Sequence, residues 1–315
     1  MFSVRLYSPE WKTVWDAFIS QSKNGTFMLG RSYLEYHADR FEDFSLMLYE
    51  DDLLRAVLPA SRHGQEIRSH GGLTYGGLVY DLKMTAQLML ECFDAIQDFL
   101  ADQEVKRLLY KRIPYIYNQY PSDEDLYALF IKKGVLIRRD ISSCIFMADH
   151  PEFSARRRRN IKKAQKAGLV IRQSLEYEAY MSLLTSVLAE RHGAAPVHTA
   201  AEMEYLARLH PENIKLFAAY RGEEMLAGTI IYETPLVAHT QYLGSSNEGR
   251  AIGALDLVID HLVNEYYRDK RYFDFGISTE HSGLYLNEGL ITQKQEFGGR
   301  GVVHEFYELS IPCKH

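Results

Sequence analysis

The chain has 315 residues, of which 46% are hydrophobic and 25% are charged, and its formal net charge is −6. This composition is ordinary for a globular protein, and the length predicts two domains or one large one. The acidic balance argues against a dedicated DNA-binding or RNA-binding protein. Three widely spaced cysteines without a CxxC pair exclude a disulfide framework and a zinc ribbon from our expectations. Since no signal-peptide core and no apolar run of membrane-spanning length occur, we expect a cytoplasmic protein that does not span a membrane.

The first half of the chain reads as a mixture of helices and strands. Helical or alternating spacing of apolar residues predicts helices at 11–20, 31–40, 88–99 and 123–133, paired strands at 44–49 and 53–60, a strand at 107–110, and a strand-rich segment at 135–147 with a break at 138–140. The glycine-rich segment 70–78 is expected to form bulges and tight bends of a strand rather than a ligand site.

The second half repeats this plan. LMLYEDDLLRAVLPA (46–60) aligns with LFAAYRGEEMLAGTII (216–231), and RLLY (107–110) aligns with YFDF (272–275). A repeated unit of this size indicates two copies of one fold rather than a solenoid. We therefore predict the α/β (α+β) class, with two tandem domains at 1–150 and 151–315, each a mixed central sheet flanked by helices.

A strongly basic segment, RRRRNIKKAQK (156–166), lies between the two copies and has seven cations in eleven residues. On a helix these cations spread over more than one face, and a solvated helix is the simplest interpretation. Such a density of positive charge also repels itself unless an anion lies nearby. The candidate phosphate-binding residues are Arg156, Arg159, Lys163 and Lys166.

The stretch from Tyr242 to Phe297 contains the strongest candidate for a ligand site. A turn punctuated by Gly244, Gly249 and Gly253 leads into an amphipathic helix, and the aromatic strand YFDFG follows. A second short helix is predicted to carry Tyr285 and to end at Gly289. Glycines before a helix allow backbone N–H groups to approach an anion, and the helix N-terminus adds partial positive charge.

Two motifs in this stretch resemble the acyl-CoA-binding half of the GNAT acetyltransferase fold. RAIGAL (250–255) is similar to the Q/R-x-x-G-x-G/A turn, with Leu255 in place of a small residue, and LYLNEGL (284–290) is similar to LY-x-x-x-GF. The degraded turn, together with YLGSS and the closing FGG, resembles the tandem-domain, FemAB-like branch. The resemblance implies a donor site formed by six residues of the second copy: Tyr242, Gly244, Ser245, Arg250, Gly253 and Ala254. It also implies that Tyr285 protonates the leaving thiolate, whereas the first copy, which lacks the basic-x-x-Gly turn, helps to shape the acceptor groove.

The general base stays open among Asp274, Glu280 and His281. Asp274 lies in the aromatic strand, and Glu280 and His281 lie in the loop where an acceptor amine is expected. An unperturbed histidine has the pKa that amine deprotonation requires, and loops carry function more often than strands. The twelve histidines show no HExxH or similar metal spacing, so no metal is expected.

These features together predict an N-acyltransferase. The resemblance implies acyl-CoA, or a similar thioester, as donor and an amine, such as that of a cell-envelope precursor, as acceptor. One alternative is a Fem-type enzyme that transfers from aminoacyl-tRNA to a cell-wall peptide precursor, with a tRNA or a lipid-linked precursor as partner. Another alternative is a non-catalytic GNAT-like scaffold, because a fold alone does not establish activity.

Overall fold

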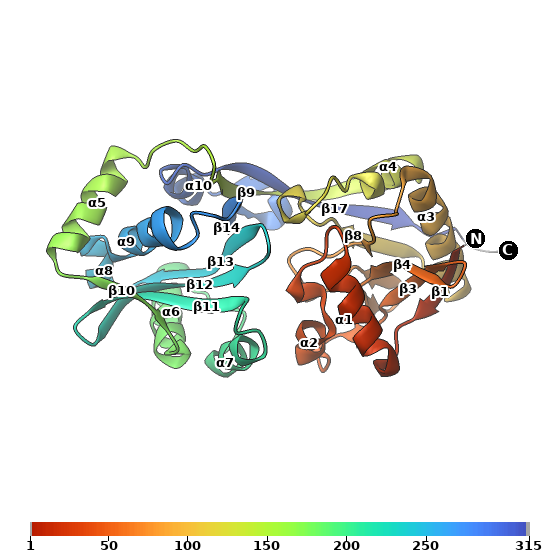
Figure 1. Ribbon diagram of the computed structural model, residues 1–315, viewed down its shortest axis with the longest axis horizontal. Coiled ribbons are helices and arrows are strands. Elements are labelled where there is room, and N and C mark those ends of the chain that lie inside the picture. Colours follow the sequence, from red (N-terminus) through yellow and green to blue (C-terminus); the bar gives the residue numbers. More distant parts are fainter. Residues whose placement is uncertain (1, 313–315) are drawn as a thin grey trace. The chain divides into compact units, whose positions relative to one another are not determined.

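The computed structural model describes residues 2–312, which form two compact units (Figure 1). Unit 1 consists of residues 2–140, 281–285 and 303–312, and unit 2 consists of residues 141–280 and 286–302. Both units combine strands with helices, as the sequence predicts.

Unit 1 contains a four-stranded antiparallel sheet and a second set of paired strands. The first sheet has the order β1 (Phe2–Leu6), β3 (Leu46–Glu50), β4 (Leu53–Leu58), β7 (Val79–Tyr80). The second set has the order β17 (Arg300–Ser310), β8 (Arg107–Lys111), β6 (Glu66–Arg68), β5 (Ser61–His63), β2 (Glu42–Asp43), with β6 and β8 parallel. The helices are α1 (Lys12–Gln21), α2 (Arg31–Leu34), α3 (Ala86–Asp102) and α4 (Glu124–Ile131). Helix α3 buries Phe93, Ile96 and Leu100 in the core of this unit.

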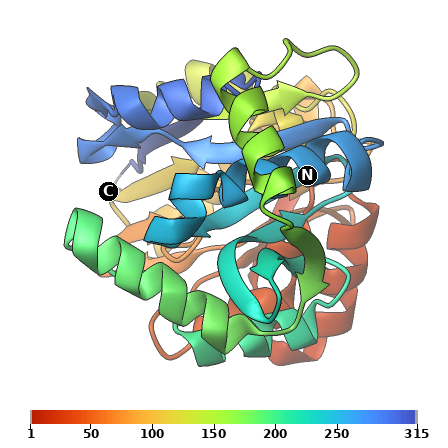
Figure 2. The ribbon, with the colours of Figure 1, turned by 90° about the vertical axis from the view of Figure 1, so that its left-hand side faces the viewer.

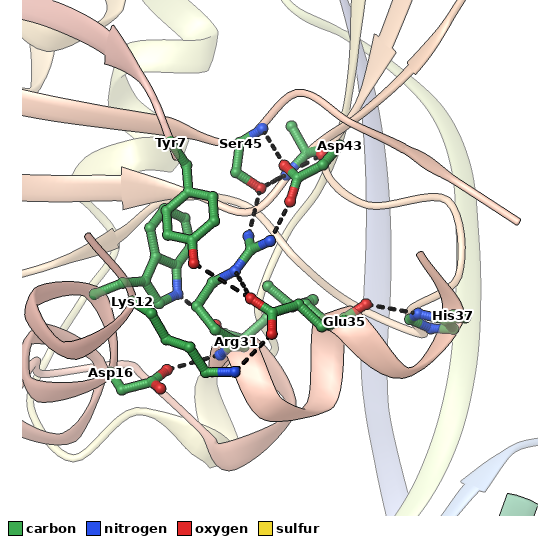
Figure 3. Close-up of polar contacts among 12 residues, drawn as sticks. Tyr7, Lys12, Asp16, Arg31, Glu35, His37, Asp43 and Ser45 are labelled. Atoms are coloured by element: carbon green, nitrogen blue, oxygen red, sulfur yellow. Dashed lines mark hydrogen bonds and ion pairs between the residues drawn. The ribbon is translucent and has the colours of Figure 1, made fainter. Parts of the chain in front are cut away.

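A buried arginine joins α2 to the strands of unit 1 (Figure 3). The guanidinium of Arg31 donates hydrogen bonds to Asp43, to Ser45 Oγ at 3.2 Å and to Glu35 Oε1 at 3.4 Å. It also lies 3.7 Å from the centre of the Tyr7 ring. Because every face of the buried cation meets an acceptor or an aromatic ring, the cluster explains how this charge is accommodated inside the fold.

Unit 2 contains one mixed sheet between two layers of helices (Figures 1 and 2). Its strand order is β10 (Val170–Ser174), β11 (Ile214–Arg221), β12 (Glu224–Glu233), β13 (Val237–Ser245), β14 (Tyr272–Ile277), β9 (Val135–Phe146), and only β13 and β14 are parallel. One layer contains α5 (Ala155–Lys166), α8 (Asn247–Ile252), α9 (Ala254–His261) with a π-helical turn at Leu262–Tyr266, and α10 (Glu288–Gln295). The other layer contains α6 (Tyr177–His192) and α7 (Ala200–Leu209).

The last strand of each sequence copy packs in the unit formed mainly by the other copy. Strand β9 ends the first copy, yet it pairs antiparallel with β14, and Ile145 is buried in the core of unit 2. Strand β17 ends the second copy, yet it pairs antiparallel with β8, and Leu309 is buried in the core of unit 1. This exchange of strands explains why each unit is discontinuous in sequence. The division into 1–150 and 151–315 describes the two copies along the sequence and stays a prediction.

Most predicted elements are present, but three local predictions are wrong. Strand β9 is continuous through 138–140, where Arg138 Nε donates to Asp140 Oδ2 at 2.7 Å and the charges are accommodated within one strand. Segment 70–78 is a loop rather than a bulged strand, and the Lys111 ammonium donates to its carbonyls at His70 (2.9 Å) and Leu73 (2.8 Å).

The third wrong prediction is the helix that was expected to carry Tyr285. Tyr285 lies in the two-residue strand β16 (Tyr285–Leu286), and α10 begins only at Glu288. The positive φ angles of His281 (51°), Ser282 (57°) and Gly283 (88°) exclude a regular helix before Tyr285. The Asn287 side chain accepts a hydrogen bond from the backbone of Leu290, and this N-cap sets the start of α10.

Candidate active site

The parallel neighbours β13 and β14 separate part-way along their length. Their pairing covers Val237–His239 and Tyr272–Asp274. Strand β13 then continues to Ser245 with β12 as its partner. Strand β14 shifts its register against β9 after Asp274, where Gly276 has a φ of +74°. In the described part of the chain, the backbone of β13 beyond His239 therefore has no strand partner on the side of β14. Such an unpaired strand edge can form hydrogen bonds with an extended ligand.

A cavity of about 390 Å³ lies beside the free end of β13, entirely within unit 2. Strand β13 contributes Leu243, Gly244 and Ser245, and three arginines bring positive charge. Helices α5, α6, α9 and α10 complete the wall. The full lining is Arg156, Arg157, Asn160, Val187, Leu188, Leu243, Gly244, Ser245, Arg250, Gly253, Leu255, Asp256, Leu290 and Gln293. A lining that combines arginines with apolar side chains suits a ligand with an anionic part and an apolar part.

A small apolar recess of about 20 Å³ adjoins this cavity. The two spaces share Leu243, Leu255, Leu290 and Gln293, and the recess is closed by Ile259, Phe275, Lys294 and Phe297. Lys294 is buried there, which lowers its pKa to about 8, and its ammonium donates to the carbonyls of Gly276 (2.8 Å) and Ile277 (2.7 Å). The lysine thus supports the backbone at the point where β14 turns away from β13.

Helix α5 crosses the start of α9 and covers it, as Figure 2 shows. Asp256, in the first turn of α9, accepts hydrogen bonds from Arg157 Nη1 at 2.7 Å and from Asn160 Nδ2 at 2.5 Å. Arg157 is 5% exposed and also lies 2.9 Å from Glu296 Oε2. Gly253 has a φ of +83°, and a Cβ there would lie 2.6 Å from the carbonyl oxygen of Asn160. The positive end of α9 is therefore already neutralised by Asp256, and Gly253 is required for close helix packing.

Part of the chain matches a known protein family. Residues 152–282 match the family described as the acetyltransferase (GNAT) domain. The second half of the chain contains a GNAT acetyltransferase domain. No curated protein matches the sequence.

Solved structures extend the likeness over both units. FemX has a TM-score of 0.69 at 12% identity, with 99% of this chain and 98% of FemX covered. L-PGS from Bacillus licheniformis has a TM-score of 0.61 at 12% identity, with 95% and 91% covered. A tandem GNAT protein from the clavulanic acid biosynthesis pathway has a TM-score of 0.52 at 9% identity, with 100% and 99% covered. The predicted tandem GNAT fold is confirmed, and the FemAB-like resemblance holds at the level of the fold. The family match supports the N-acyltransferase class, while identities this low leave the substrates open.

The structure brings several predicted donor-site residues together in the GNAT domain. Gly244, Ser245, Arg250, Gly253 and Arg156 all line the cavity. Arg250 donates to Asn247 Oδ1 at 2.6 Å, within α8.

Other members of the predicted sets lie outside the cavity lining. Ala254 is fully buried, and the hydroxyl of Tyr242 lies 2.7 Å from His198 Nδ1. Arg159, Lys163 and Lys166 are exposed on α5, and Lys163 donates to the Ala251 carbonyl at 2.7 Å.

The candidate bases have different environments. Asp274 is completely buried, accepts a hydrogen bond from Ser142 Oγ, and lies 2.7 Å from His239 Nδ1. Glu280 is exposed and accepts from Asn287 Nδ2 at 2.8 Å. His281 and Tyr285 belong to unit 1, where both are exposed and their ring centres are 6.0 Å apart. Asp274 therefore needs an intermediary to exchange a proton with a substrate.

Sequence reasoning missed Arg157, Lys294 and His239. The first could have been found, because Arg157, Ile161 and Ala164 share one face of α5 at helical spacing and all three are buried. His239 offered no such signal, since its partner Asp274 is 35 residues away and only the parallel pairing brings them together.

Two further observations concern the described residues as a whole. Within residues 2–312, no group of three or more histidine, cysteine, aspartate or glutamate side chains is arranged to bind a metal ion. No helix in the same range is both long enough and apolar enough to cross a membrane.

Proposed function

We propose that the protein is an N-acyltransferase that binds its activated acyl donor in the cavity of unit 2 and transfers the acyl group to an amine. The observation that carries the proposal is the opening between β13 and β14, together with a cavity at the free end of β13 whose lining includes Arg156 and Arg250. Acyl-CoA or a similar thioester is the proposed donor. The proposed acceptor is the amine of a cell-envelope precursor, in the cytoplasm.

The donor would lie with its anionic part against the two arginines and its acyl end along β13. Backbone N–H groups of the open part of β13, just beyond His239, would then stabilise the oxyanion of the tetrahedral intermediate, and one such donor is worth roughly 3 kcal/mol. The amine nitrogen attacks the acyl carbon directly. As the C–N bond forms, the bond to the leaving atom breaks and that atom takes the electron pair.

The neighbouring cysteine does not favour a covalent enzyme intermediate. Cys144, on β9, is buried, and burial raises the pKa of its thiol well above the ordinary value. A thiol that stays protonated is a poor nucleophile. Direct attack by the amine is therefore the simpler route.

A second candidate donor is aminoacyl-tRNA, and the covered start of α9 favours it. Leu255, Asp256 and the crossing helix α5 occupy space where the GNAT resemblance implies a pyrophosphate. The exposed cations Arg159, Lys163 and Lys166 are available to a phosphate backbone, as they are to a lipid-linked acceptor.

Thermal unfolding with acetyl-CoA, free CoA and charged tRNA tests the proposal. A ligand at 100 times its dissociation constant should stabilise the protein by about 2.7 kcal/mol. Arg250→Gln should remove most of the shift produced by the true donor. Arg268→Gln, whose side chain is 72% exposed and outside the cavity lining, is the matched control and should retain the shift. Stabilisation by charged tRNA alone would favour the second donor, and no shift with any of these ligands would favour a scaffold.

A further inference from the structure

A histidine, an aspartate and a serine form a hydrogen-bonded chain where β13, β14 and β9 meet. Asp274 lies at its centre, completely buried, with Ser142 donating to one carboxylate oxygen and His239 Nδ1 lying 2.7 Å from the other. Ser142 is also completely buried, whereas the His239 side chain is 13% exposed. The hydrogen-bonded chain therefore leads from the interior of the sheet to a partly exposed imidazole.

This imidazole lies where the two parallel strands begin to separate. His239 and Asp274 are the last register partners of β13 and β14. Beyond them, β13 proceeds to the Gly244–Ser245 segment that lines the cavity. We propose that His239 is the base that accepts the proton of the acceptor amine, and that Asp274 and Ser142 position it; this rests on the proposed acyl transfer.

Hydrogen bonding supports the assignment of a free basic nitrogen. When the Asp274 carboxylate is ionised, it only accepts; Nδ1 of His239 then donates to it, and the lone pair of the neutral imidazole lies on Nε2. Among residues 2–312, no hydrogen bond to Nε2 is present. The Ser142 hydrogen bond to the other oxygen fixes the carboxylate, which in turn fixes the ring and its tautomer.

The alternatives among the predicted bases are weaker on geometry. Asp274 has no exposed surface with which to touch an amine. Glu280 is exposed, but it already accepts a hydrogen bond from Asn287 and has no buried partner that fixes its orientation. Of His239, Asp274 and Glu280, only His239 combines a partly exposed side chain with a fixed orientation.

Other titratable groups surround the pair on the neighbouring elements. Cys144 on β9 is the register partner of Asp274, and burial raises its pKa. Tyr232 on β12 is the register partner of His239 and is buried. Lys294 of α10, whose pKa is lowered to about 8 by burial, interacts electrostatically with Asp274. These groups must be kept unchanged when the pH profile of His239 is measured.

The proposed step is balanced without a further reactant. The amine nitrogen forms a bond to the acyl carbon, and the proton that it loses goes to Nε2 of His239. The bond between the acyl carbon and the leaving atom breaks, and the leaving atom takes the electron pair. The proton on His239 then passes to solvent, which leaves the neutral imidazole for the next turnover.

The decisive experiment measures acyl transfer against pH for the full-length parent and for His239→Gln, with the donor that stabilises the parent. n-Butylamine and hydroxylamine serve as acceptor probes, because the former is protonated at neutral pH and the latter is not. With n-butylamine at neutral pH the variant should be slower by about 100-fold or more, the usual scale for a lost base. Its rate should recover as rising pH deprotonates the amine, and the deficit with hydroxylamine should be much smaller.

The chain offers a matched control in His261. This histidine of α9 also pairs with a carboxylate through Nδ1, at 2.8 Å from Glu265 Oε2, but its side chain is 27% exposed and does not line the cavity. His261→Gln should match the parent at every pH. Asp274→Asn should lower the n-butylamine rate and displace the acidic limb of the pH profile, a change that a purely structural aspartate would not produce.

The outcomes separate this inference from the proposed function. If the parent transfers acyl groups and His239→Gln has the same rate and pH profile, the role of His239 is wrong and acyl transfer stands. If the parent binds no donor and transfers nothing, the proposed function itself is wrong, and the role of His239 falls with it. A selective loss at neutral pH, repaired by high pH or by hydroxylamine, would support His239 as the base.

Discussion

Unit 1 and unit 2 differ at the aligned strands β8 and β14, which follow helices α3 and α9, the helices that occupy the same place in the two copies. In unit 1, Tyr110 ends the RLLY segment, and its hydroxyl accepts from the backbone of Leu78 and donates to Asp125, both at 2.9 Å. The aligned residue of unit 2 is Phe275, which has no hydroxyl and lines the apolar recess. Tyr110 thus links neighbouring segments of unit 1 through its hydroxyl, whereas Phe275 makes no such link and borders the apolar recess of unit 2.

The starts of the matched helices show a second difference. Helix α3 of unit 1 begins with Thr85, whose side chain accepts a hydrogen bond from the backbone of Leu88 within the same segment. Helix α9 of unit 2 begins with Gly253, and its first turn depends on Arg157 of α5. The comparison teaches that α9, which borders the cavity, is stabilised at its start by a residue of another helix. Helix α3, which does not border this cavity, is capped by a residue of its own segment.

The largest effect is expected from Arg157→Ala, which would break the buried contact between α5 and α9. The change leaves the buried Asp256 without its cation, whereas Glu296 keeps Arg156 at 3.6 Å, and removing one partner of a buried ion pair typically costs about 3–5 kcal/mol. Urea unfolding at neutral pH measures the loss. Thr85→Ala should cost only about 1 kcal/mol, the usual value of a helix N-cap.

Arg158 provides the matched control for Arg157. It is the next residue of the same helix, but it pairs with Glu152 on the surface, and exposed pairs contribute at most about 1 kcal/mol. If Arg157→Ala and Arg158→Ala destabilise the protein equally, the start of α9 does not depend on α5.

An intermediate effect is expected from Tyr110→Phe, which gives unit 1 the side chain of unit 2. The variant leaves the buried N–H of Leu78 without its acceptor and Asp125 without a donor, at a cost of about 1–3 kcal/mol. The free energy of unfolding, again from urea titration, is the measurement. Tyr127→Phe, in the same unit but 51% exposed, should change it by less than about 0.5 kcal/mol. Equal values for both variants would show that the Tyr110 hydroxyl does not stabilise unit 1.

The sequence was informative where structure depends on local periodicity. The hairpins at 46–60 and 216–231 and the helices α3, α5 and α9 follow from spacing within a single segment. The prediction for Tyr285 failed because the segment before it adopts three consecutive positive φ angles, which no apolar pattern reveals.

Other features depend on partners that the sequence does not specify. The alternation of apolar and polar residues in β9 and β17 would be the same in either unit. Their exchange between the units could therefore not be predicted from the sequence. The pairing of His239 with Asp274 similarly arises from the register of two strands. Gly253 was recognised as special, but the backbone of Asn160 that demands a glycine there is visible only in three dimensions.

The smallest effect is expected from the combined variant Arg159→Gln and Lys166→Gln on α5. Both side chains are exposed and neither lines the cavity, so the free energy of unfolding should change by no more than about 0.5 kcal/mol. For an acyl-CoA donor, the affinity and its salt dependence should match the parent, whereas Arg156→Gln, at the rim of the cavity, should weaken both. Isothermal titration calorimetry across a salt series makes the measurement. If the combined variant instead weakens binding of charged tRNA and flattens its salt dependence, the outer face of α5 contacts a phosphate backbone, and the aminoacyl-tRNA donor becomes the better description of unit 2.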